Sequence, residues 1–109
     1  MEMVISRFEV WLVELEPVRG SEISKTRPCV VISPDITNKF LKTVTIAAMT
    51  TSSKQYPTRV NCVFQNTKGQ IALDQIRSVD KVRLVRKLGN LNDKTSKEVC
   101  EVLVELFSY

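Results

Sequence analysis

Residues 17–35 read PVRGSEISKTRPCVVISPD, a charged loop that runs directly into a short apolar segment. The proline and glycine near its start predict a loop over residues 16–26, and the apolar residues that follow predict a strand over 27–33. Arg27 stands at the junction, and Glu22 lies in the loop before it. A guanidinium and a carboxylate at the mouth of a loop can act on a phosphodiester without metal or histidine. The chain contains no histidine.

Outward from this segment, the sequence predicts many short strands. Alternating or continuous apolar patterns, rich in β-branched residues, are typical of strands and occur at residues 8–15, 43–49, 58–64, 71–73, 75–79 and 82–88. Residues 34–41 are expected to form a connector with one helical turn. A turn is expected over residues 66–69, with Gly69 supplying the permissive backbone. Trp11 lies inside the first strand pattern, so we expect it in the core.

The C-terminal segment has a different period. Its apolar residues follow the helical spacing i, i+3, i+4, i+7 at Val99, Val102, Leu103 and Leu106. Thr95 and Glu98 have the spacing of a capping box and are expected to begin this helix. Many short strands with one terminal helix indicate a mainly β protein, folded as a small, strongly bent antiparallel sheet or barrel.

Composition narrows the class of protein. With 109 residues, 43% hydrophobic and 26% charged, the chain is expected to form one globular domain. No apolar run is long enough to span a bilayer, and the N-terminus does not resemble a signal peptide. The odd count of three cysteines predicts reduced thiols in a cytoplasmic protein. A net charge of +4 suits a polyanionic partner, either nucleic acid or an acidic protein.

Three collinear blocks resemble the MazF/PemK family of toxin endoribonucleases. The first joins VWLV at residues 10–13 and EP at 16–17 to RGSEI at 19–23 and KTRP at 25–28. The second is MTTSSK at 49–54 with YP at 56–57, and the third is GQIALDQIRSVD at 69–80. The resemblance implies one toxin domain over residues 1–109, an SH3-like barrel of the MazF/PemK/CcdB type with a C-terminal helix, and a homodimer. One departure is Phe8 before Glu9, where many relatives have a glycine before the acid.

The resemblance also implies catalytic residues. Arg27 matches the family's catalytic arginine, Thr50 its active-site threonine and Glu22 a glutamate that serves as general base in some members. Thr51, the next residue in the sequence, is the alternative candidate for the active-site threonine. Asp74 is a rival to Glu22, but one branch pairs that acid with an arginine two residues earlier, where this chain has alanine. The departure favours the arrangement of Glu22, Arg27 and Thr50.

Further polar residues are expected to bind RNA, and no metal or cofactor is expected. They are Ser21, Lys25, Thr51, Ser52, Lys54, Asp74 and Gln75. Tyr56 is the aromatic side chain best placed for base stacking, because it shares a loop with Lys54. A basic stripe of Arg77, Lys81, Arg83, Arg86 and Lys87 either follows RNA or pairs with the acidic face of the last helix.

The function that follows from the resemblance is that of a type II toxin, restrained by an acidic antitoxin, that cuts single-stranded mRNA sequence-selectively without metal. Attack by the 2′-OH would leave a 2′,3′-cyclic phosphate, or the 3′-phosphate formed from it, and a 5′-OH. Two alternatives stay open: a gyrase inhibitor like CcdB, and a degenerate RNA or antitoxin binder. The CcdB branch uses a C-terminal tail with tryptophan, whereas this chain ends in LFSY and its only tryptophan is Trp11.

Overall fold

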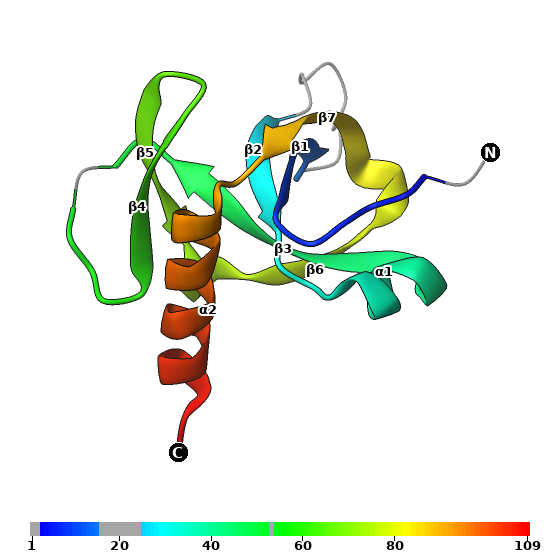
Figure 1. The fold of residues 1–109 in the computed structure, drawn as a ribbon. Coiled ribbons are helices and arrows are strands. Elements are labelled where there is room, and N and C mark those ends of the chain that lie inside the picture. The colour runs from blue at the N-terminus through cyan, green and yellow to red at the C-terminus, as the bar shows by residue number, and fades with distance from the viewer. Residues whose placement is uncertain (1–2, 16–24, 53) are drawn as a thin grey trace.

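Strand β3 organises the sheet because it pairs with three other strands. In this computed structural model, which describes residues 3–15, 25–52 and 54–109, the sheet has the strand order β4-β5-β3-β2-β1-β7, and β6 also pairs with β3 (Figure 1). All pairings are antiparallel. The elements are β1 (Glu9–Glu14), β2 (Thr26–Val31), α1 (Asp35–Phe40), β3 (Thr43–Thr50), β4 (Arg59–Phe64), β5 (Thr67–Ala72), η1 (Leu73–Gln75), β6 (Arg77–Asp80), η2 (Lys81–Arg83), β7 (Leu84–Asn90) and α2 (Asp93–Phe107).

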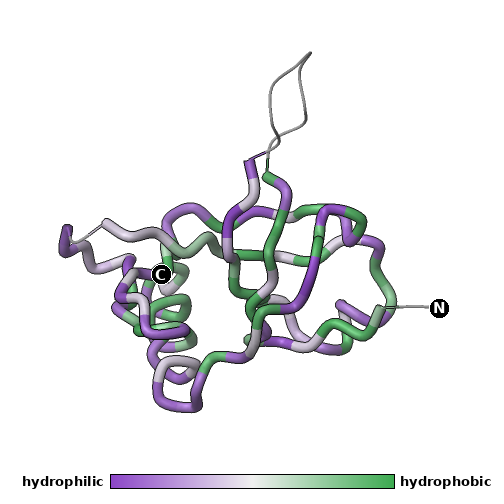
Figure 2. The backbone as a smooth tube through the Cα atoms, turned by 90° about the horizontal axis from the view of Figure 1, so that it is seen from above, coloured by the Kyte–Doolittle hydropathy of each residue, from purple (hydrophilic) through white to green (hydrophobic). Residues whose placement is uncertain are grey.

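The curled sheet buries apolar side chains on both of its faces. One cluster includes Trp11, Cys29, Ile46 and Ala48, which confirms the core position of the tryptophan. The other includes Val30, Ala47, Ile71 and Leu73, and α2 covers it through Val99. Hydrophobic and hydrophilic stretches both occur along the backbone, and hydrophobic stretches lie in the interior of the fold (Figure 2). The prediction of a mainly β half-barrel with a C-terminal helix is confirmed.

Two local predictions are wrong. The expected turn at residues 66–69 lies earlier: Gln65 and Asn66 have φ of 50° and 64°, and Phe64 pairs with Thr67. This two-residue connection matches the twist of the flanking strands, so Gly69 falls inside β5. Helix α2 begins at Asp93 behind Asn92, whose side chain accepts a hydrogen bond from the backbone N–H of Thr95 at 2.8 Å. Asparagine is among the preferred N-cap residues, and it replaces the predicted capping box.

Phe8, which stands where many relatives have a glycine, lies in the turn before β1. Phe8 has φ of 68°, a conformation that favours glycine, and its side chain packs against the second core cluster. Next to it, the buried Glu9 accepts hydrogen bonds from the Ser6 N–H and Trp11 Nε1 and pairs with Lys87 at 3.0 Å. Burial acts to raise the pKa of Glu9, but these contacts outweigh it and hold the pKa below its usual range. The acid is thus structural and lies at β1, at the other end of the strand from the loop that carries Glu22.

No helix among the described residues has the length and apolarity to cross a membrane. Cys29, Cys62 and Cys100 are free thiols, and the first two are buried. The reading of the cysteines as unbridged residues is confirmed.

Candidate functional site

Arg27 on β2 and Thr50 on β3 both lie two residues beyond the end of the ladder that joins these strands. The ladder pairs Cys29 with Ala48 and Val31 with Ile46, so the two residue numbers sum to 77 at each pairing. Arg27 and Thr50 have the same sum, so they keep the register of the ladder. Directly opposed residues of an antiparallel pair project from the same face and lie within contact range. The arginine is exposed and the threonine is half-buried.

A row of polar residues continues from this pair across two more strands. Thr50 pairs with Gln70 on β5, and Gln70 pairs with Asn61 on β4. Gln70 is only 2% exposed, and its Nε2 donates to the carbonyl oxygen of Lys54 at 2.5 Å and to Asn61 Oδ1 at 3.2 Å. The buried glutamine therefore fixes the loop after β3 to the same sheet face that presents Arg27 and Thr50.

A second arginine lies near the first. Arg77 on β6 pairs with Ile46 on β3, the same residue that faces Val31 on β2. Burial raises the pKa of the Cys29 thiol to about 12, while the positive charges of Arg27 and Arg77 act in the opposite direction. Arg27 and Arg77 thus both contribute positive potential at this thiol. The sequence placed Arg77 only in a basic stripe, because the pairing that joins β6 to β3 is not a local pattern.

The backbone after β3 wraps around the Thr50 hydroxyl. Thr50 Oγ1 accepts from the N–H of Ser52 at 3.2 Å, and Ser52 Oγ accepts from the N–H of Lys54 at 3.3 Å. A hydroxyl that accepts from the backbone keeps its own proton available for an external acceptor. Thr50 and Thr51 both border a cavity of about 220 Å³ with Pro28 and Gly69. Only Thr50 has the register that faces Arg27.

Asp74 is held away from this row by a different arginine. Its Oδ1 lies 2.9 Å from Nε of Arg59, its Oδ2 accepts from the other guanidinium nitrogen at 3.4 Å, and Thr58 Oγ1 donates to it at 3.2 Å. Arg59 pairs with Ala72 across the β4–β5 ladder. Ala72, which stands where one branch of the family has an arginine, thus faces Arg59 of the neighbouring strand. The hydrogen bond from Arg59 lowers the pKa of Asp74, which makes this carboxylate a weak base.

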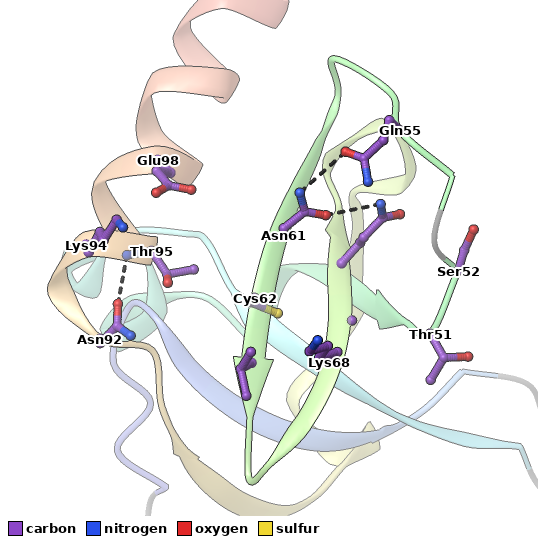
Figure 3. A pocket seen from close by; sticks show the side chains of 13 residues that line it. Thr51, Ser52, Gln55, Asn61, Cys62, Lys68, Asn92, Lys94, Thr95 and Glu98 are labelled. Carbon is purple, nitrogen blue, oxygen red and sulfur yellow. Dashed lines mark hydrogen bonds between the residues drawn. The ribbon is translucent and has the colours of Figure 1, made fainter.

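A larger, polar cavity of about 490 Å³ lies beside the loop after β3 (Figure 3). Its walls include Thr51, Ser52 and the amides of Gln55 and Asn61, which are hydrogen-bonded to each other at 3.4 Å (Figure 3). On the other side the start of α2 contributes Asn92 and Lys94. Within residues 3–15, 25–52 and 54–109, no group of three or more His, Cys, Asp or Glu side chains is arranged to hold a metal ion.

Comparison with known proteins places the chain in a family. The family described as "PemK-like, MazF-like toxin of type II toxin-antitoxin system" matches residues 6–107. The chain belongs to the PemK/MazF toxin family. A curated relative from Staphylococcus saprophyticus, named Endoribonuclease MazF, is 41% identical over 102 residues, which cover 88% of this chain and 85% of the relative.

Solved MazF structures share the fold of this toxin. MazF from Deinococcus radiodurans superposes with a TM-score of 0.80 at 24% identity, covering 99% of this chain and 100% of that one. A MazE-MazF crystal structure from the same organism gives a TM-score of 0.81 at 24% identity, with 96% of each chain covered. At this level of identity the likeness concerns the fold, and it confirms the expected MazF-type barrel with a terminal helix.

The remaining predicted site residues of the toxin lie in several places. Lys25 and Lys54 are exposed at the two ends of the candidate site, one before β2 and the other in the loop after β3. Gln75 is exposed at the end of η1, next to Asp74. Ser21 and Glu22 lie outside the described residues. The structure therefore places Arg27 and Thr50 on neighbouring strands, and Asp74 and Gln75 in η1, which follows β5.

Gly69 supports the Thr50 backbone through a close approach, which leads to a stability and activity prediction. A Cβ atom at residue 69 would lie 2.7 Å from the carbonyl oxygen of Thr50, closer than real Cβ contacts allow. We expect Gly69→Ala to displace Thr50, lowering both the thermal midpoint and the rate of RNA cleavage. Gly89→Ala is the matched control, because its Cβ would meet only the Phe64 ring, at 3.1 Å. Equal cleavage rates for the two variants would show that the Thr50 backbone tolerates the displacement.

Proposed function

We propose that this toxin cleaves single-stranded mRNA at selected sequences, using the 2′-OH of the substrate as nucleophile and no metal ion. The observation that carries the proposal is the register of β2 and β3, because its extension beyond Cys29 and Ala48 relates Arg27 to Thr50 on one face of the sheet. The family relationship supports the reaction class, since the Staphylococcus saprophyticus relative is named an endoribonuclease. Attack would leave a 2′,3′-cyclic phosphate, or the 3′-phosphate formed when it opens, and a 5′-OH.

The residues of the site divide the chemistry between them. The phosphorane that forms on attack carries extra negative charge on its nonbridging oxygens, and fixed donors aimed at these oxygens lower the barrier. Arg27 supplies a planar fork that matches two of them, and Thr50 supplies a hydroxyl donor. Arg77 adds positive charge to the same sheet, because it acts together with Arg27 on the Cys29 thiol. Glu22 is proposed as the general base that accepts the 2′-OH proton.

Asp74 is a poorer candidate for the general base. A base works best when its pKa lies near the operating pH, whereas the contact with Arg59 lowers the pKa of this carboxylate. Both carboxylate oxygens also accept a hydrogen bond from Arg59, which stabilises the ionised form. We therefore assign Asp74 and Gln75 to RNA binding, together with Ser21, Lys25, Thr51, Ser52 and Lys54.

The partners proposed for the toxin are single-stranded RNA, a second copy of the chain and an acidic antitoxin. MazE-MazF complexes among the structures that share this fold support an antitoxin partner. The mRNA substrate supports action in the cytoplasm. The net charge of +4 suits both polyanionic partners.

RNA cleavage is expected to persist in EDTA, because the site chemistry described above needs only side chains. The measurement uses purified toxin and a long RNA in EDTA, with the 5′ ends of the fragments mapped and their end groups determined. We expect cuts at one recurring sequence, each leaving a 5′-OH. Loss of cutting in EDTA, with recovery on adding Mg²⁺ or Mn²⁺, would contradict the metal-independent mechanism. RNA that is bound but never cut would identify a degenerate binder.

A further inference from the structure

We propose that Tyr56, Arg59 and Asp74 form a base-reading site, which selects one nucleotide near the cleaved bond by the hydrogen-bonding edge of its base. This inference rests on the proposed function, because it names the residues that give the cleavage its sequence preference. Of these three residues, Asp74 alone was assigned to RNA binding above. In the site proposed here, the choice of base also requires the guanidinium of Arg59 and the ring of Tyr56.

The ion pair is a rigid, two-point contact. Arg59 binds Asp74 through Nε at 2.9 Å and through a terminal nitrogen at 3.4 Å, so the guanidinium and carboxylate planes are held side by side. Thr58 donates a further hydrogen bond to the same carboxylate oxygen as Nε. The side chain of Arg59 is only 12% exposed and that of Asp74 is 35% exposed. A pair held in this way keeps its donors and acceptors in fixed positions, which base recognition requires.

The edge that the pair presents is mixed in polarity. Asp74 is an acceptor in its ionised form, which the contact with Arg59 favours. The Nη2 atom of Arg59 has a second N–H, next to the one that binds Asp74 Oδ2. An acceptor beside a donor complements the edge of an unpaired base, on which a donor also stands beside an acceptor. Guanidinium and carboxylate groups are common partners of guanine and cytosine, respectively, in base-specific contacts.

Tyr56 completes the site with a flat surface. Its ring lies 5.2 Å from Cζ of Arg59, and the backbone N–H of Arg59 donates to the Tyr56 carbonyl oxygen at 3.0 Å. The aromatic side chain is 47% exposed. Exposed aromatic rings bind single-stranded bases by stacking, which tolerates any sequence. Stacking on Tyr56 would hold a base, and the neighbouring pair would test its edge.

The site lies on the same sheet face as the proposed scissile position. Thr50 pairs with Gln70 and Gln70 with Asn61, while Arg59 lies two residues before Asn61 on β4. Residues two apart on a strand share a face, and ideal strand spacing puts the Cα atoms of Thr50 and Arg59 about 12 Å apart. A few nucleotides of extended single strand cover this span. The selected base therefore belongs to a nucleotide close to the cut and is not the nucleotide that is cut.

The test is the cleavage motif of the toxin and its variants on a randomised RNA pool, read from mapped 5′ ends. We expect Arg59→Lys to reduce the preference at one motif position by about tenfold. Lysine keeps the positive charge but lacks the planar guanidinium that donates two parallel hydrogen bonds. Asp74→Asn is expected to relax the same position. Tyr56→Ala is expected to raise KM by about tenfold for all sequences, whereas Tyr56→Phe keeps the ring and is expected to raise KM less than Tyr56→Ala does.

Separate outcomes distinguish this inference from the proposed function. An Arg59→Lys enzyme that cuts the wild-type motif with undiminished preference overturns the base-reading site and leaves the nuclease intact. A lower thermal midpoint with an evenly reduced rate assigns the pair to folding and also overturns it. If the wild type cuts no RNA, the variants are compared for binding to single-stranded oligonucleotides that differ at one base. Loss of base preference in that assay supports the inference, and unchanged preference overturns it.

Discussion

Arg27→Ala is expected to lower the cleavage rate on the order of 10²–10³-fold while leaving the protein folded. The arginine stabilises charge that develops only in the transition state, and removing one such donor costs about this much in other enzymes. Its exposed position at the start of β2 means that truncation removes little packing. Single-turnover cleavage of an oligonucleotide that carries the mapped motif measures the effect. The thermal midpoint of the variant serves as the folding control.

Two further variants locate the site by register. Arg27→Lys keeps the positive charge but lacks the planar guanidinium, so its cleavage rate should lie between those of Arg27→Ala and the wild type. Thr50→Val should give a smaller loss of the same kind as Arg27→Ala, and Thr51→Val a smaller loss still, because only Thr50 has the register that faces Arg27. If Thr51→Val proves the more damaging change, the assignment is off by one residue. Near-normal cleavage by Arg27→Ala would reject the site.

The parts of the fold that depend on local pattern could be predicted from the sequence. Apolar alternation located β1, β3 and β4, and the helical period located α2. The start of α2 was misplaced because Asn92 and the pair Thr95 and Glu98 are rival capping signals separated by three residues. The position of the β4–β5 turn was also wrong, because Gly69 is a turn former by propensity. In the structure, its missing side chain serves close packing against Thr50.

Single residues of the site could be predicted from the sequence, but the strand pairing that makes them neighbours could not. Arg27 and Thr50 each stand at the end of an apolar strand, and the family resemblance singled them out, but their opposition follows from the register of β2 against β3. The Arg59–Asp74 pair could not be anticipated, because Ala72 suggested that the acid had lost its arginine. The partner comes from the opposite strand of the β4–β5 hairpin, 15 residues away in the sequence. Arg77 reaches the same region through another non-local pairing.

Antitoxin binding is expected to exclude RNA, because the two ligands need the same positive surface. Arg27 and Arg77 both act on the Cys29 thiol with their positive charge, and Lys25 and Lys54 are exposed on the segments before β2 and after β3. An acidic, disordered segment that folds on this surface would replace the phosphates with carboxylates. Arg77→Ala should therefore weaken the binding of both partners, and added salt should weaken the electrostatic part of each. Lys97→Ala should change neither affinity.

The decisive measurement is competition between the antitoxin and an RNA made uncleavable by a 2′-deoxy or 2′-O-methyl group at the cut site. If the sites coincide, the apparent Kd for RNA should rise about elevenfold when free antitoxin is about ten times its own Kd. A ternary complex with unchanged affinity for both ligands would disprove occlusion. Inhibition would then have to act through the subunit arrangement, and Arg77→Ala would weaken RNA binding while leaving antitoxin binding intact. The two mechanisms thus differ in both the competition curve and the response to one substitution.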